Sequence, residues 1–301
     1  MPDIQIRIRL NIGAVQLNIS SPCAYNEKDT SRHADAAIAC TTSSFQPHAT
    51  KALREWYEES LSKRLFAVGP QVPLSAIPSG LYKAPVVAAA GSPFHPIFTF
   101  LDAQPVKSVI FISFGSVFYP TQEWQVETMY KTLLETRTPF IASKSSATFK
   151  PLSTELDDKI KQSGLGTFVD FVPQREILGH PSMGSFLMHG GNNSLWESIL
   201  SGVLNIFWSI IGDQVDHSAY MSEVLDCSWE LIQVRTGNVD GTPQAVATEF
   251  KRVLSELKGE VSERKRKNLQ AVRQQTLEAL AEDGEVKKEV QALLKWASGD
   301  V

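Results

Sequence analysis

The sequence predicts an α/β protein whose main part is a doubly wound, Rossmann-like parallel sheet. From residue 97 onward, short apolar runs alternate with helical patterns, which is typical of parallel βαβ units. These runs are apolar almost without interruption, as expected for strands that helices cover on both faces. The predicted strands span residues 108–114, 139–143, 166–172, 184–188, 203–208 and 230–234.

The segments between these strands have the periodicity of helices. Helices are predicted over residues 123–135, 153–162, 175–179 and 194–201, and another is predicted to begin near Asp213. Gly202 ends the helix over 194–201, because glycine adopts the left-handed conformation that follows many helices. Three charged, amphipathic helices are expected after the last strand.

The first 96 residues form a less regular region. Residues 4–10 alternate apolar and polar side chains as a half-buried strand does, and residues 14–19 are expected to pair with them. Strands are also expected over 35–41 and 64–70, around a helix over 46–61. The prolines of residues 71–96 favour an extended linker. We therefore predict a partial N-terminal domain (1–70), a linker (71–96), a main domain (97–285) and a C-terminal helix (286–301).

Composition excludes several classes of protein. The chain has 301 residues and a net charge of −4, so a broad basic surface for nucleic acid is not expected. No apolar run is long enough for a transmembrane segment, and the N-terminus lacks the pattern of a secretory signal. The three cysteines have no metal-ligand spacing and are odd in number, which indicates a reducing compartment and a cytoplasmic location.

The stretch HGGNNSLWES at residues 189–198 gathers small polar side chains between two apolar segments. It lies where a strand gives way to a helix, and the free N–H groups and dipole of a helix start attract anions, phosphate above all. An alternative is that Ser194 and Glu197 form an ordinary capping box, which has no role in binding. From this stretch alone the two interpretations stay open.

Other polar residues also follow predicted strands, and the carboxyl ends of parallel strands meet in one crevice. An aromatic residue and an amide at 171–174, the helix start near 189, a carboxylate at 197 and an Asp-Gln pair at 213–214 therefore converge. An aromatic ring can stack on a base, a carboxylate can accept from a ribose, and a helix start can hold a diphosphate. The ligand that these groups describe is a nucleotide sugar.

This order of motifs resembles the donor-binding signature of UDP-dependent glycosyltransferases with the two-domain GT-B fold, of the family 1 type. The family pattern is roughly W-x-P-Q, H-x-G-x-N-S, E and D-Q, and residues 171–217 follow it in order and spacing. Residues 107–124 look like the start of the family's donor domain, and residues 34–70 resemble the end of its acceptor domain more weakly.

The resemblance implies a role for each matching residue. Phe171 would stack on uracil, and Val172 would contact the uracil edge through its main chain. Gln174 and Glu197 would contact the ribose. The remaining donor-binding residues would hold the phosphates (Ser116, His189, Gly191, Asn193, Ser194) and the sugar hydroxyls (Asp213, Gln214).

Some positions depart from the family pattern. Asn192 stands where plant members have tryptophan, and His217 stands where they have asparagine. The family's general base is a histidine in the first strand-to-helix loop of the N-terminal domain. No residue of this sequence matches it, so the resemblance implies a chain truncated at the N-terminus and no catalytic residue can be named.

The expected function is the inverting, metal-independent transfer of a hexose from UDP-sugar to a small lipophilic acceptor. Glucose is the expected hexose, because the final glutamine of the signature accompanies glucose donors in the family. The sequence has no Asp-x-Asp motif, so we expect no metal and no cofactor beyond the UDP-sugar co-substrate. Three alternatives stay open: an enzyme that needs a partner chain to supply the acceptor domain, a non-catalytic UDP-sugar-binding module, and a shortened product without a stable role.

Overall fold

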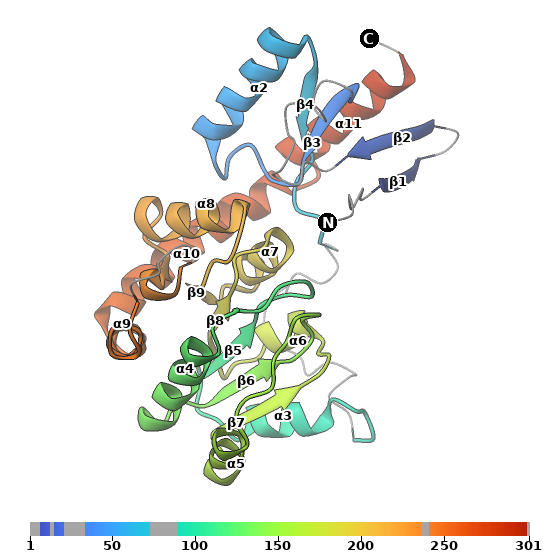
Figure 1. The fold of residues 1–301 in the computed structure, drawn as a ribbon. Coiled ribbons are helices and arrows are strands. Elements are labelled where there is room, and N and C mark those ends of the chain that lie inside the picture. Colours follow the sequence, from blue (N-terminus) through green and yellow to red (C-terminus); the bar gives the residue numbers. More distant parts are fainter. Residues whose placement is uncertain (1–6, 13–14, 21–33, 73–89, 236–240, 300–301) are drawn as a thin grey trace. The chain divides into compact units, whose positions relative to one another are not determined.

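A computed structural model describes residues 7–12, 15–20, 34–72, 90–235 and 241–299 (Figure 1). The chain divides into two compact units. One comprises Met1–Gln71 together with Val272–Val301, and the other comprises Val72–Ala271. The second unit contains the motifs that the sequence singled out.

The core of residues 72–271 is a six-stranded parallel sheet in the order β10-β9-β8-β5-β6-β7 (Figure 1). The chain runs from β5 outward through β6 and β7, then returns to the other side of β5 for β8, β9 and β10. This reversal makes the sheet doubly wound, as predicted. The strands are β5 (Val109–Ser113), β6 (Phe140–Ser143), β7 (Gly166–Val169), β8 (Met183–Met188), β9 (Leu204–Phe207) and β10 (Ser228–Glu230).

All strands of this sheet except the half-buried edge strand β7 are buried, and most of their side chains are apolar on both faces. In the centre, Phe111 of β5 and Phe186 of β8 lie in register and stack with ring centroids 4.9 Å apart. Both rings are completely buried. Such near-continuous burial explains why the strands read as unbroken apolar runs in the sequence.

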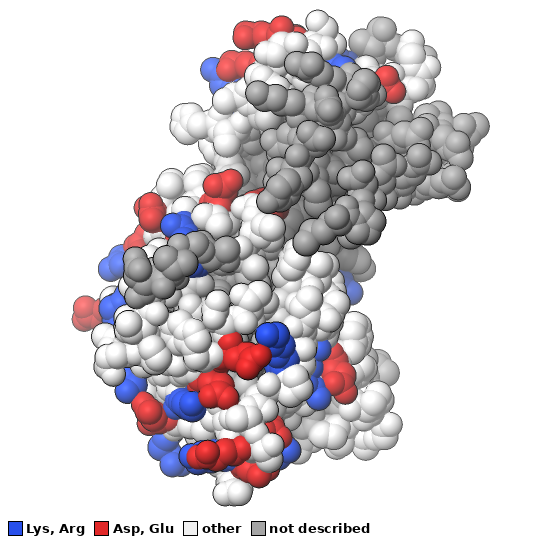
Figure 2. All heavy atoms as spheres, in the orientation of Figure 1, with Lys and Arg blue, Asp and Glu red and all other residues white. Residues whose placement is uncertain are grey.

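Helices connect and cover these strands. They are α3 (His95–Asp102), α4 (Glu123–Glu135), α5 (Thr154–Ser163), α6 (Gln174–Leu178), α7 (Asn192–Ser201), α8 (Asp213–Ala219) and α9 (Pro243–Glu256). A π-helical turn over Tyr220–Val224 extends α8. Figure 2 shows acidic and basic side chains interspersed on the visible face around α4 and α5, with no broad basic area there.

Two predictions for this unit need correction. The last strand is Ser228–Glu230, and Ile232–Val234, inside the segment 230–234 predicted as a strand, form a 3-10 turn. Burial explains the error, because Ser228 and Glu230 are polar residues that the sheet nevertheless buries. Helix α3 lies partly within the predicted linker and was not predicted, since Pro96 discouraged it. Proline is tolerated there because it occupies the first turn of the helix.

The other unit contains a short parallel pair, β3 (Ala36–Ala39) with β4 (Arg64–Ala67), joined by α2 (Pro47–Leu61). The predicted hairpin is present, with β1 (Arg7–Ile12) antiparallel to β2 (Val15–Ser20), while residues 4–6 and 14 of the predicted strands lie outside the described residues. Helix α10 (Glu260–Ala279) leads to α11 (Glu285–Ser298), and α11 packs on β4.

Polar contacts attach α11 to these strands. The Glu289 carboxylate accepts a hydrogen bond from the Ala67 backbone N–H at 3.2 Å and pairs with Arg54 at 2.8 Å. Glu285 accepts from both the N–H and the hydroxyl of Ser44, each at 2.9 Å. The C-terminal helix therefore belongs to the same unit as the N-terminal strands. Within the described ranges, no helix combines the length and apolar character needed to cross a membrane.

Candidate functional site

The predicted site residues lie in the loops that leave the carboxyl ends of the parallel strands in unit 72–271, or in the helices that begin there. Ser116 follows β5, Phe171 follows β7, His189 follows β8 and Asp213 follows β9. The strand order reverses between β5 and β8, and the carboxyl edge at such a point is where open α/β sheets bind ligands. The topology thus gathers the separate motifs at one edge.

Helix α7 begins at Asn192, two residues before Ser194. Its N-cap is Gly191, which has no side chain to cap the helix, and its first turn contains no acidic residue. Ser194 is already inside the helix, so the capping-box interpretation of Ser194 and Glu197 is wrong. The N–H groups of the first turn are left available to an anion, and the helix dipole favours one.

The ring of His189 lies between two glycines. A Cβ at Gly115 would lie 2.8 Å from the ring Cε1, and a Cβ at Gly191 would lie 2.3 Å from the ring Nε2. These glycines are therefore needed for the histidine to occupy this place. The buried Nδ1 of the ring has no hydrogen-bond partner among the described residues.

The environment of His189 fixes its charge. Burial lowers the pKa of His189 from 6.5 to about 4, although the Asp213 carboxylate and the Ser113 backbone act in the opposite direction. At neutral pH the ring is therefore uncharged. A neutral imidazole can still donate one hydrogen bond to a phosphate oxygen, but it contributes no positive charge.

Three of the predicted residues form one hydrogen-bonded group. The side-chain amide of Gln174, at the start of α6, donates to the Glu197 carboxylate at 2.6 Å and to the Ser194 hydroxyl at 3.2 Å. Glu197 lies on α7, which packs on α6. Burial raises the pKa of Glu197, and the hydrogen bond from Gln174 and the charge of Arg175 oppose this effect.

Arg175 lies beside this hydrogen-bonded group, and sequence reasoning missed it. Its Nε lies 4.0 Å from Oε1 of Glu197, and its buried terminal nitrogen Nη1 has no hydrogen-bond partner in the described structure. No sequence signal could have identified it, because its proximity to Glu197 depends on how α6 packs on α7.

Asp213 and Gln214, which were both expected to bind the sugar hydroxyls, differ in their exposure. Asp213 is exposed, whereas Gln214 is buried and its side-chain oxygen accepts the N–H groups of Ile210 and Ile211 at 2.9 and 3.0 Å. Only the side-chain nitrogen of Gln214 remains for a ligand. His217, a departure from the family pattern, contacts the Gly190 carbonyl oxygen through Nδ1 at 2.9 Å and so attaches α8 to the loop before α7.

The remaining predicted residues are accessible or structural. Phe171 is 74% exposed, which is unusual for a large aromatic side chain and leaves its ring open to stacking. Val172 beside it is buried. Ser116 and Asn193 are exposed, and the Ser116 carbonyl accepts the Ala147 N–H at 3.0 Å.

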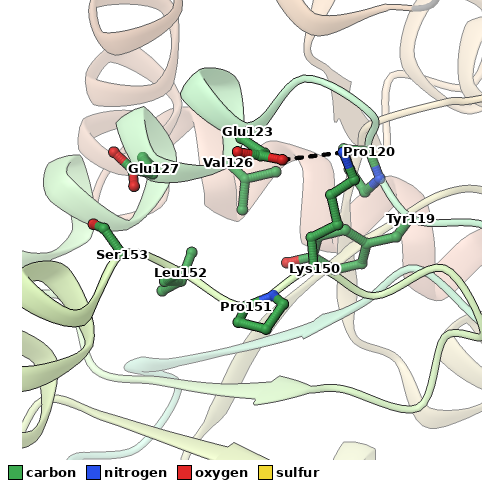
Figure 3. A pocket seen from close by; sticks show the side chains of 9 residues that line it. All are labelled: Tyr119, Pro120, Glu123, Val126, Glu127, Lys150, Pro151, Leu152 and Ser153. Atoms are coloured by element: carbon green, nitrogen blue, oxygen red, sulfur yellow. Dashed lines mark hydrogen bonds and ion pairs between the residues drawn. The ribbon is translucent and has the colours of Figure 1, made fainter.

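A cavity of about 240 Å³ lies where the loops after β5 and β6 meet the start of α4, with Ser153 just before α5 also in its lining (Figure 3). Lys150 and Glu123 form an ion pair at its edge at 3.0 Å, and Glu127 also lines it (Figure 3). Two carboxylates make this cavity unsuitable for a diphosphate. The start of α7, which has no acidic residue in its first turn, therefore suits an anion better than this cavity does.

Known proteins resemble this chain in sequence and in fold. Residues 71–256 match the family described as UDP-glucoronosyl and UDP-glucosyl transferase. The chain is 32% identical to the UDP-glycosyltransferase eriJ of Hericium erinaceus over 68% of this chain and 41% of that protein. It is 37% identical to the 7-deoxyloganetic acid glucosyltransferase of Catharanthus roseus over 41% of this chain and 26% of that protein.

Among solved structures, UGT2 of Phytolacca americana complexed with UDP-2fluoro-glucose and pterostilbene superposes with a TM-score of 0.68. Its sequence is 25% identical, and the match covers 90% of this chain and 54% of that one. The predicted GT-B-type α/β fold is thus confirmed. The chain spans about half or less of the length of these relatives.

Proposed function

Because this chain belongs to the UDP-glucoronosyl and UDP-glucosyl transferase family, we propose that residues 171–217 bind a UDP-sugar and supply the donor side of a glycosyl transfer. The proposed donor is UDP-glucose and the proposed acceptor is a small lipophilic molecule. The named relatives are transferases, which favours an enzyme over a non-catalytic binding module. The acceptor itself, and a partner chain that would complete its binding site, stay predictions.

The observation that supports this proposal most is the hydrogen-bonded group of Gln174, Ser194 and Glu197 beside an uncapped helix start. A ribose has two neighbouring hydroxyls that can donate to one carboxylate, and Glu197 offers such an acceptor. Phe171 would stack on the uracil from the exposed loop after β7. The diphosphate would then lie at the N-terminus of α7, where N–H groups and the hydroxyl of Ser194 are available.

In the proposed reaction a base on the acceptor side takes the proton of an acceptor hydroxyl, the oxygen bonds to the anomeric carbon, and the bond to UDP breaks, which inverts the configuration at that carbon. Negative charge grows on the departing diphosphate, so fixed donors near it lower the barrier. The start of α7 and the neutral His189 would supply those donors without a metal ion. Asp213 and the side-chain nitrogen of Gln214 would bind the sugar hydroxyls.

Calorimetric titration of the full chain with UDP, UDP-glucose and ADP tests this proposal. UDP and UDP-glucose should bind and ADP should not. Phe171→Ala should weaken UDP binding by about 1–3 kcal/mol, the usual contribution of stacking a base on an aromatic ring. Val106→Ala is a matched control, since Val106 is also exposed (71%) but precedes β5 at the opposite edge of the sheet.

Transfer of glucose from UDP-glucose to a phenolic acceptor, and hydrolysis without acceptor, are measured on the same preparation. Inversion is read from the anomeric configuration of the product, and the need for a metal is tested with a chelator. Equal affinity for UDP and ADP, or a UDP affinity that Phe171→Ala leaves unchanged, would contradict the proposed binding site.

A further inference from the structure

Arg175 has an arrangement that the fold alone does not explain. It extends from the short helix α6 toward Glu197 on α7, and its Nε stops 4.0 Å from Oε1, beyond hydrogen-bonding distance. Its terminal nitrogen Nη1 is buried and has no hydrogen-bond partner among the described residues. Buried donors in native proteins are nearly always satisfied, because an unsatisfied one costs free energy. An arginine kept only for stability would be expected to complete its hydrogen bonds.

The two oxygens of Glu197 have different neighbours. Oε2 accepts the hydrogen bond from Gln174 at 2.6 Å, whereas Oε1 lies 4.0 Å from the Arg175 Nε and accepts no hydrogen bond from the described residues. Oε1 can therefore accept a hydrogen bond from a ligand while the cation stays within 4.0 Å of it. This difference between the two oxygens is expected of a carboxylate that must be oriented and ionised before the ligand binds.

The ionisation of Glu197 depends on a small set of groups. Burial raises the pKa of this carboxyl, Gln174 and Arg175 lower it, and the neighbouring carboxylate of Glu176 raises it. Glu197 is the only titratable residue of α7, and β9, which also packs on α7, has none. Arg175 is thus the one cation in the described structure that opposes the effect of burial on Glu197.

We propose that Arg175 is a positioning residue of the nucleotide site, which holds Glu197 as an oriented anion so that the ribose hydroxyls of UDP can donate to it. This inference rests on the proposed function, since it requires UDP to bind at Glu197. It assigns Arg175 no direct contact with the nucleotide.

The test is the dependence of UDP affinity on pH, measured by calorimetry on the full chain and on Arg175→Gln. Without the cation, the pKa of Glu197 should rise further and the carboxylate should be lost at a higher pH. For each unit by which the pKa of Glu197 rises, the apparent UDP affinity of Arg175→Gln should fall up to about tenfold at pH values below that pKa. At alkaline pH its affinity should differ little from that of the wild type. Titration of UDP itself and of His189 is common to all variants and cancels in the comparison.

Three further variants make the outcome specific. Arg175→Lys keeps a positive charge and should follow the wild-type curve on the acid side. In a Glu197→Gln background, Arg175→Gln should have no further effect, because no carboxylate remains to be ionised. Lys159→Gln, which removes an exposed cation on α5, should leave the curve unchanged. Melting curves verify that each variant is folded, and Arg175→Met replaces Arg175→Gln if the latter is not.

Parallel curves for wild type and Arg175→Gln would overturn the inference, whether affinity is unchanged or uniformly reduced. The same holds if Arg175→Lys behaves like Arg175→Gln, or if the effect persists in the Glu197→Gln background. Failure of the wild-type chain to bind UDP at any pH would instead overturn the proposed function, and the inference with it.

Discussion

Replacing Gly191 by alanine should displace the ring of His189 and weaken UDP binding. The backbone at Gly191 has φ −62° and ψ 143°, which alanine adopts without strain. The new methyl group, however, would lie 2.3 Å from Nε2 of His189 and 3.0 Å from Cε1. The ring cannot simply retreat toward Gly115, because that side is also closely packed.

The distances set the size of the effect. Carbon atoms in favourable contact lie about 3.5–4 Å apart, so the ring must move by roughly 1 Å or more. Overpacking of this kind typically costs about 1–3 kcal/mol of unfolding free energy. Loss of the proposed hydrogen bond from His189 to the charged diphosphate should weaken binding by about 1.5–3 kcal/mol, which is roughly 10- to 150-fold in Kd.

A double-mutant cycle separates this clash from other effects of the methyl group. Gly191→Ala, His189→Ala and the double variant are compared by chemical unfolding and by UDP titration. Once His189→Ala has removed the ring, Gly191→Ala should cost little more, which gives a coupling of about 1–3 kcal/mol. Gly259→Ala is the control, since nothing lies within 4 Å of its new methyl group. An equal loss from Gly191→Ala with and without the ring would refute the reasoning.

Two other substitutions test the site independently. Glu197→Ala should weaken UDP binding by about 1.5–3 kcal/mol, the range for hydrogen bonds to charged groups, and any fall in melting temperature should come from the lost hydrogen bond with Gln174, because α7 is not capped by this residue. His189→Asn should flatten the pH dependence of stability. In the wild type the unfolded imidazole binds protons with a pKa of 6.5 and the folded one only near 4, so stability falls as the pH drops between these values. That loss amounts to about 3 kcal/mol, which an asparagine, having no proton to bind, should not show.

These measurements are calorimetric titration with thermal melting for Glu197→Ala, and urea unfolding at several pH values for His189→Asn. Unchanged UDP affinity with a lowered melting temperature would remove Glu197 from the proposed site. Parallel stability curves for His189→Asn and wild type across the acid range would show that His189 is not held neutral by burial.

The sequence predicted the sheet well because its information there is local. The strands of residues 109–207 and the helices α4 and α5 appear where apolar runs and helical periodicity place them. The prediction failed at β10, where Ser228 and Glu230 are polar and yet buried. No local pattern signals burial of that kind, because neighbouring elements impose it.

The donor signature likewise allowed the candidate site residues to be chosen from sequence, since order and spacing along the chain are themselves sequence properties. The hydrogen bonds between those residues and their charge states could not be predicted from the sequence. Contacts made in the folded chain determine the neutral state of His189 and the two hydrogen bonds from Gln174. The same is true of the hydrogen bond that the Gln214 side-chain oxygen accepts from the Ile210 N–H. For the same reason Arg175 was overlooked, although it follows Gln174 directly.

By itself, then, the sequence determined the fold class, the family resemblance and the set of residues that lie at the carboxyl edge. Only the tertiary structure decided which charges those residues have, which of them are joined, and that α11 completes the unit of the N-terminal strands. Ser44 and Glu285 are separated by 241 residues and still form hydrogen bonds. Periodicity reports which face of an element is buried, because that depends on neighbours a few residues away. It cannot report which distant element covers that face, because the partner is selected by packing and hydrogen bonding of the whole folded chain.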